Sequence, residues 1–148
     1  MKNRFRFLAL VLALLSACTV LASCRKKEIS VYVNQIVCNE YSYSTDGKFT
    51  KKTEVHTFEK KNSEGENYVT LTYEEGLQVK LYPQGFPYNA TVLSEKKPYI
   101  FQSQSSCATV NDEGIITFTK AGTVIIHIYP ADGGDVSTTV IVRAKEVN

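Results

Sequence analysis

The sequence predicts an all-β protein built as a sandwich of antiparallel sheets, and three observations lead to this prediction. Segments near the C-terminus alternate apolar and other residues with a period of two, which is typical of strands that bury one face. Turn-forming residues separate these segments at short intervals. No segment after residue 23 has a convincing helical repeat. Short strands with turns at this spacing favour a β-sandwich.

The first 23 residues are predicted to be a targeting segment. Basic residues in MKNRFR precede an apolar stretch that is continuous from Phe7 to Leu15 and extends with brief interruptions to Ala22. Its core is too short and ends too abruptly for a comfortable transmembrane helix. Leu21-Ala22-Ser23-Cys24 then resembles a bacterial lipobox, which implies cleavage before Cys24 and lipidation of its thiol. Cys18, in Leu15-Ser16-Ala17-Cys18, fits the same pattern, but Cys24 stands where the apolar stretch ends. An ordinary secretory leader or an uncleaved anchor is the alternative.

The expected location is the cell envelope. By resemblance to lipoprotein sorting rules, the non-acidic Arg25 after the lipidated Cys favours the outer membrane over the inner one. The sequence leaves open whether the body faces outward or into the periplasm.

Residues 24–66 are expected to form a tether and a β-hairpin extension. Ile29, Val31 and Val33 alternate with polar residues, and Thr45-Asp46-Gly47 is a hairpin signal. The polar stretch NSEGE at 62–66 marks the predicted boundary with a sandwich domain at 67–148. About forty residues cannot close a sandwich alone, so the hairpin either extends one sheet of that domain or forms a spacer above the membrane.

Residues 103–144 predict four strands. The segment 123–129 places Val124, Ile126 and Ile128 on one face and Ile125, His127 and Tyr129 on the other. The turn and break signals that separate the strands are NDEG at 111–114, KAG at 120–122 and DGGD at 132–135.

The same region resembles a known family, the group 2 bacterial immunoglobulin-like (Ig-like) domain of intimin- and invasin-type surface proteins. The matching residues are Ser105-Ser106, Ala108-Thr109-Val110, Gly114, Ile116-Thr117, Ala121-Gly122-Thr123, Ile126 and Val140-Ile141-Val142. Upstream, residues from Tyr68 resemble the first two strands of the family, with Glu75-Gly76 at the turn. The resemblance covers residues 67–145 and implies an Ig-like sandwich, but it says little about a ligand. The family usually has a Trp just before the Ser pair, and Ile100 or Phe101 is expected to fill that core site.

Two cysteines, Cys38 and Cys107, remain after the leader and the lipidated Cys are set aside. In an oxidising compartment they either form a disulfide that ties the hairpin to the sandwich or serve as two buried thiols.

Catalytic, metal and nucleic-acid functions are not expected. His56 and His127 have no metal-ligand spacing, and no nucleophile elbow or glycine-rich phosphate loop occurs. Removing the three leader cations from the 17 basic residues leaves 14 against 15 acidic residues, so no basic footprint for nucleic acid remains. No cofactor and no metal site are predicted.

The sequence feature most suited to binding is the aromatic segment LYPQGFPYNAT. Its Tyr82, Phe86 and Tyr88 lie beside two prolines that stiffen the predicted loop, which could stack on a sugar or dock a protein. Alternatively, Tyr82 and Phe86 fold back to cover the end of the core. The predicted function is therefore a non-catalytic, lipid-anchored envelope protein that mediates adhesion or binds a protein or glycan. The alternative is a structural or accessory lipoprotein whose sandwich is a spacer or assembly module.

Overall fold

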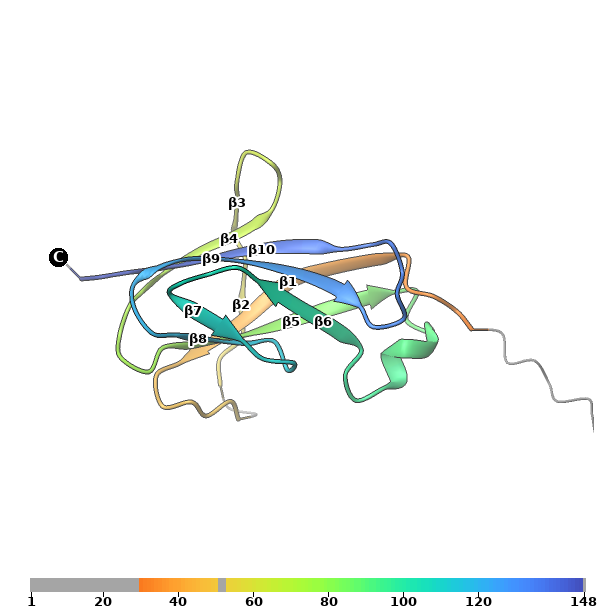
Figure 1. Ribbon diagram of the computed structural model, residues 1–148, viewed down its shortest axis with the longest axis horizontal. Coiled ribbons are helices and arrows are strands. Elements are labelled where there is room, and N and C mark those ends of the chain that lie inside the picture. The colour runs from red at the N-terminus through yellow and green to blue at the C-terminus, as the bar shows by residue number, and fades with distance from the viewer. Residues whose placement is uncertain (1–29, 51–52, 148) are drawn as a thin grey trace, which may run out of the picture.

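The structure is a computed structural model that describes residues 30–50 and 53–147 (Figure 1). The predicted leader with Cys18, and Cys24 after it, lie outside the described residues. Within them, no helix is long and apolar enough to cross a membrane.

The described chain is an Ig-like β-sandwich of two five-stranded sheets, which confirms the predicted fold class. The first sheet, here sheet A, has the order β2-β1-β5-β8-β7, and sheet B has the order β3-β4-β10-β9-β6. The strands of sheet A are β1 (Gln35–Ser44), β2 (His56–Thr57), β5 (Gln78–Phe86), β7 (Ala108–Val110) and β8 (Ile115–Phe118). Those of sheet B are β3 (Lys60–Lys61), β4 (Asn67–Thr72), β6 (Tyr99–Ser103), β9 (Gly122–Pro130) and β10 (Thr138–Lys145). A short 3-10 helix, η1 (Thr91–Ser94), precedes β6.

The core lies between the two sheets. Val124, Ile126 and Ile128 of β9 have no exposed surface, whereas Ile125 is 44% exposed. This confirms the faces predicted from the period-two pattern. The other strands add side chains to the same core, including Val140 and Val142 of β10, Val79 and Leu81 of β5, and Ile116 and Phe118 of β8.

Strand β1 belongs to the sandwich. Of the two predicted roles for the N-terminal extension, it therefore extends one sheet of the sandwich and does not form a separate spacer. It pairs with β5 from Gln35 to Ser44, with a bulge between Val37 and Glu40, and it places Cys38 in the core. The expected long hairpin does not form, because β2 pairs with only two residues of β1 and β3 pairs with β4. The division at residue 66 therefore does not separate two structural units. It falls between β3 and β4, within one sandwich.

One pairing departs from the expected antiparallel arrangement. Strand β4 runs parallel to β10, with Asn67 opposite Val140 and Thr72 opposite Lys145. The reason is topological. The segment 56–61 crosses from sheet A, where β2 pairs, to sheet B, where β3 pairs, and β4 then joins the sheet beside β10.

The two flanks of the sandwich differ. On one flank, β2 and β3 are two-residue edge strands, and the exposed Lys60 and Lys61 lie on β3. On the other flank, β6 and β7 are the edges of sheets B and A, and residues 104–107 cross between them. Both of these strands lie toward the viewer in Figure 1.

The described chain begins and ends at opposite ends of the long axis of the sandwich (Figure 1). Hydrogen bonds attach residues 31–34 to the end that holds η1. Val31 N–H donates to Thr91 Oγ1 over 3.0 Å, and Asn34 N–H donates to the carbonyl of Phe86 over 2.8 Å. Val33 N–H donates to the carboxylate of Asp132 over 2.9 Å.

The two cysteines are free buried thiols. Of the two predicted alternatives, the disulfide is therefore wrong. Cys38 lies in β1 and Cys107 directly precedes β7, and β5 and β8 separate these strands in sheet A. Strand spacing then places the two residues about 14 Å apart. A disulfide requires Cα atoms within about 7 Å of each other.

Both thiols are expected to resist alkylation in the folded protein. Burial raises the pKa of the Cys38 thiol from 9.0 to about 12, and Cys107 is only 5% exposed. Between these two pH values the unfolded chain loses a proton that the folded chain keeps, so this group lowers the free energy of unfolding as the pH rises. Mass spectrometry after iodoacetamide treatment in urea, without reductant, should find both cysteines alkylated. If the cysteines in urea became alkylated only after a reductant was added, this would contradict the presence of free thiols.

Candidate binding surfaces

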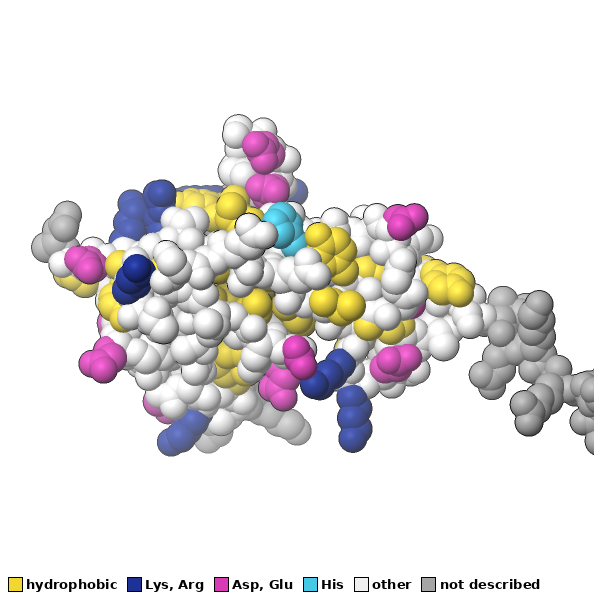
Figure 2. Space-filling model, viewed as in Figure 1, with side chains coloured by type: hydrophobic (Ala, Val, Ile, Leu, Met, Phe, Trp, Pro, Cys, Tyr) yellow, Lys and Arg dark blue, Asp and Glu magenta, His cyan; other side chains and the backbone are white. Residues whose placement is uncertain are grey.

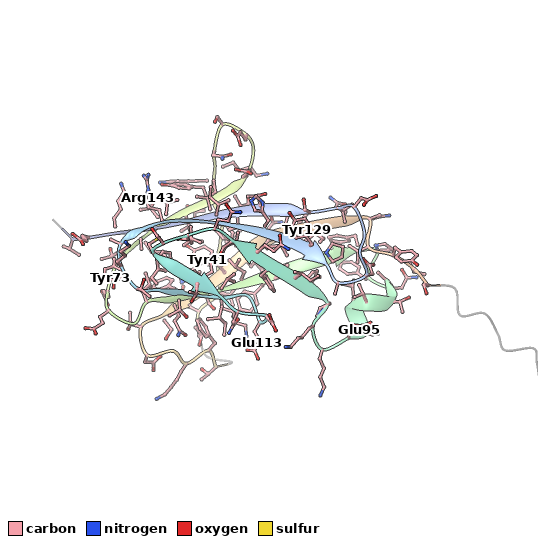
Figure 3. All side chains as sticks on the ribbon, viewed as in Figure 1. Tyr41, Tyr73, Glu95, Glu113, Tyr129 and Arg143 are labelled. Atoms are coloured by element: carbon pink, nitrogen blue, oxygen red, sulfur yellow. The ribbon has the colours of Figure 1, made fainter. Side chains whose placement is uncertain are left out.

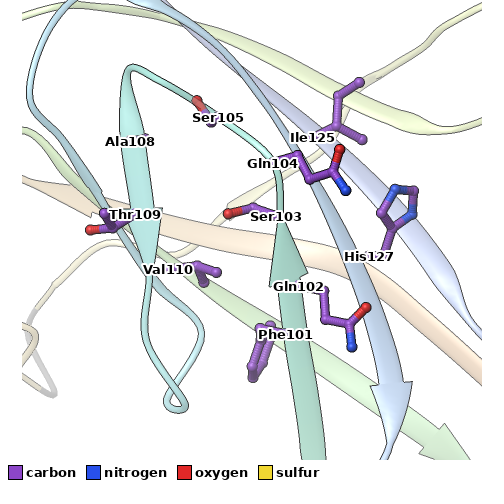
Figure 4. Close-up of a pocket in the computed structure, with 10 residues that line it drawn as sticks. All are labelled: Phe101, Gln102, Ser103, Gln104, Ser105, Ala108, Thr109, Val110, Ile125 and His127. Carbon is purple, nitrogen blue, oxygen red and sulfur yellow. The ribbon is translucent and has the colours of Figure 1, made fainter.

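A groove of about 780 Å³ lies on the β6/β7 flank (Figure 4). It is lined by residues of β6, of the following segment, of β7 and of β9, and none of them is charged. The polar groups are the amides of Gln102 and Gln104, the hydroxyls of Ser103, Ser105 and Thr109, and the imidazole of His127. Groups of this kind hydrogen-bond neutral partners such as peptide groups or sugar hydroxyls.

Strand β6 positions its side chains alternately on the two sides of sheet B. Phe101 packs against the core, whereas Ile100 is 46% exposed, so Phe101 fills the core site for which the sequence left two candidates. The turn at Gly114 lets the Phe101 ring approach closely. A Cβ atom at Gly114, whose φ is 73°, would lie 2.7 Å from Cζ of the ring.

The outer face of sheet B continues the uncharged surface beyond the groove. Gln102 lies opposite His127 in the strand pairing, and His127 Nδ1 lies 3.1 Å from Thr139 Oγ1 of β10. In the next row, Ile125 lies opposite Ile141. Figure 2, viewed toward the β6/β7 flank, shows mostly white and yellow atoms over the middle of the molecule, with a histidine in cyan above them and the charged side chains around the margin.

The structure does not bring the three predicted loop residues together. Strand β5 continues to Phe86, so Tyr82 is a strand residue on the outer face of sheet A. Its hydroxyl is 2.8 Å from Oγ of the fully buried Ser42. Lys80 Nζ lies over the rings of Phe49 and Tyr82, at 5.9 and 5.8 Å from their centroids. Tyr82 therefore helps to cover sheet A.

Phe86 and Tyr88 form a second surface with Tyr32, here called the end patch. The rings of Phe86 and Tyr88 are 4.6 Å apart, and Tyr88 is 73% exposed. Tyr32 is 62% exposed and lies at the same end, because its neighbours Val31 and Asn34 bond to Thr91 and Phe86. No local signal in the sequence places Tyr32 at this end. Its position depends on hydrogen bonds between segments more than fifty residues apart.

Tyr41 and Tyr43, two tyrosines of β1, belong to a different cluster. Tyr41 packs on Phe58 with ring centroids 4.6 Å apart, and His56 lies 5.1 Å from Tyr43 and 5.5 Å from Tyr41. Burial raises the pKa of Tyr41. These contacts close the β2/β3 flank and leave His56 in an aromatic environment.

The described residues contain no group of three or more His, Cys, Asp or Glu side chains that could hold a metal ion. Asp132, in the predicted DGGD turn, uses its carboxylate to accept hydrogen bonds from the backbone of Val33 and Gly134. Its role is to fix the N-terminal segment and the turn.

Comparisons with known proteins add little to this description. No protein-family model matches the sequence, and no curated protein matches it. Among solved structures, the chain is similar to an intimin mutant of EHEC O157:H7, with 17% identity and a TM-score of 0.45. The match covers 76% of this chain and 48% of that one, so this chain spans about half of the intimin chain.

Proposed function

We propose that this chain is a non-catalytic, lipid-anchored protein of the cell envelope that binds a protein or glycan partner through the groove on the β6/β7 flank. The observation that carries the proposal is the groove itself. It is a large hollow without charged residues, lined by amide, hydroxyl and imidazole groups from four adjoining segments. Neutral hydrogen-bonding groups around a few apolar side chains suit an uncharged partner.

The position of the anchor supports use of the flank for binding. Cys24 precedes Ser30, the first described residue, by six positions, which bridge at most about 20 Å. The end patch would therefore face the membrane, where tyrosine side chains are common at the boundary between lipid and water. The groove, on the side of the sandwich, stays accessible in that orientation.

A spacer role is the second candidate, and one observation favours it. The described chain enters at one end of the elongated sandwich and leaves at the other (Figure 1), as a spacer requires. In that case the groove would have no ligand of its own.

Anchoring and orientation are tested together by protease shaving of intact cells, with lysed cells as the control. After cell fractionation, the wild-type sandwich should remain with the membrane fraction. When protease is added to intact cells, it should be digested. Cys24→Ser should release it from the membrane, whereas Cys18→Ser should not. Protection of the wild-type sandwich in intact cells, with digestion after lysis, would rule out adhesion to another cell.

Binding through the groove is tested by screening glycan and host-protein arrays with the purified chain. Gln102→Ala should weaken a retained ligand at least tenfold. Gln84→Ala is the matched control, because Gln84 is also exposed but lies on sheet A and outside the groove. Equal loss in both variants would contradict binding at the groove, and the absence of any ligand would favour the spacer role.

A further inference from the structure

We propose that β6 pairs edge to edge with β6 of a second copy of this protein, antiparallel, around a twofold axis at Phe101. This inference deepens the proposed function by naming the partner at the groove, and its cellular setting rests on that function.

Strand β6 has unpaired main-chain groups on its free edge. The backbone N–H of Ala131 donates to the carbonyl of Pro98 over 2.9 Å, so these opposite residues form a bonded pair. Bonded and non-bonded pairs alternate along an antiparallel ladder. Tyr99, Phe101 and Ser103 are therefore the non-bonded positions toward β9, which agrees with Pro130, a residue without N–H, lying opposite Tyr99.

The N–H and C=O groups of these three residues consequently point away from β9. Within the described part of the chain, no loop or side chain forms a hydrogen bond with them. An antiparallel second β6 centred on Phe101 would place Tyr99 of one copy opposite Ser103 of the other. Every one of these donors and acceptors would then have a partner, which is how strand addition gains affinity.

Side chains also match under this symmetry. Ile100 would lie opposite Gln102 of the second copy and lose its exposure to water. Phe101, which lines the groove and is half-buried in one copy, would be covered by the same residue of the other. A twofold interface of this kind is self-complementary and closed, so it stops at a dimer.

The charges near β6 permit this pairing. The sequence from Tyr99 to Val110 contains no charged residue. Lys96 and the ion pair of Lys97 with Asp112, at 2.9 Å, lie at the start of β6. Antiparallel pairing brings this charged end beside the uncharged Gln104 end of the second copy. On the opposite flank, the exposed lysines of β3 protect the edge, as edge charges commonly do.

The orientation defines which copies can pair. Because β6 begins at the end where residues 31–34 are attached, antiparallel pairing places the two N-terminal ends at opposite ends of the dimer. Copies with a short N-terminal anchor could pair in this way from two facing membranes, but not as neighbours on one membrane. The proposed dimer is therefore an adhesive contact between cells that carry the same protein.

The register is tested by disulfide cross-linking of the chain from Ser30 onward, which contains both sheets and the whole described core. Chains with Ile100→Cys mixed with chains with Gln102→Cys should form a cross-linked heterodimer under mild oxidation. Mixing Ile100→Cys with Gln84→Cys, on the other sheet, should not. Equal cross-linking in both mixtures would overturn the proposed register.

Self-association itself is measured by analytical ultracentrifugation. The wild-type chain should show a concentration-dependent dimer, and Ser103→Pro should weaken it at least tenfold, because proline removes an N–H that points to the free edge and not to β9. Unchanged thermal unfolding of that variant would show an intact fold. A wild-type chain that stays monomeric overturns the inference, and ligand binding in the array assay would then leave the proposed function standing.

The facing geometry is tested with beads that carry the chain by its N-terminus. Beads of two colours should form mixed clusters, and beads with Ser103→Pro should stay dispersed. A dimer in solution without bead clustering would overturn the adhesive contact between facing surfaces.

Discussion

Replacing Ile126 by alanine is expected to lower the free energy of unfolding by about 2–5 kcal/mol, because the change leaves a cavity between the two sheets. Ile126 has no exposed surface, and it lies in β9, which pairs with both β10 and β6. The surrounding side chains are held by this pairing and cannot collapse fully into the space. Urea unfolding followed by circular dichroism measures the effect.

Ile125→Ala is the matched control for this variant. Ile125 is the neighbouring residue of the same strand and the same type, but its side chain is 44% exposed on the outer face. Its truncation should cost less than about 1 kcal/mol, mostly through lower strand propensity. Similar losses for the two variants would contradict the assignment of the strand faces.

Replacing Gly76 by alanine is expected to destabilise the protein by about 2–4 kcal/mol, from two separate causes. Gly76 has a φ of 82°, a backbone conformation that residues with a Cβ adopt only at a cost in free energy. In addition, a Cβ here would lie 2.6 Å from the carbonyl oxygen of Thr45. Because that oxygen belongs to the main chain after β1, relief requires a shift of the β1 end relative to the turn before β5. Chemical unfolding monitored by circular dichroism gives the loss.

Gly65→Ala separates these two causes. Gly65 also has a φ of 82°, but no atom lies within 4 Å of the position that its Cβ would take. The backbone conformation alone should therefore cost about 1–2 kcal/mol at Gly65. If both variants lost the same stability, the close approach of Thr45 to Gly76 would have no energetic importance.

Much of the sandwich could be predicted from the sequence because its strands alternate over consecutive residues. The pattern from Thr123 to Tyr129 assigned Val124, Ile126 and Ile128 of β9 to the core correctly, and the turn at Gly114 forms as expected, with Gly114 N–H donating to the carbonyl of Asn111. Segments before residue 67 were harder to interpret. Their strands are short or bulged, and two-residue strands such as β2 leave no periodic signal.

The candidate site was predicted less well than the fold. Exposed aromatic residues were expected in one loop, yet Tyr82 lies within β5 and bonds to Ser42, while the rings of Phe86 and Tyr88 lie together at one end of the sandwich. The uncharged character of 99–110 is visible in the sequence. This segment lines a groove only because β6 and β7 are the edges of different sheets.

The sequence by itself determined which residues of each long C-terminal strand face the core and where the chain turns. These properties follow from neighbouring residues. Only the tertiary structure decided that β1 joins sheet A, that Cys38 and Cys107 stay apart, and that β6 ends its sheet with unpaired main-chain groups. Such features depend on which strands become neighbours. Contacts between distant segments decide this, and those contacts leave no trace in local periodicity.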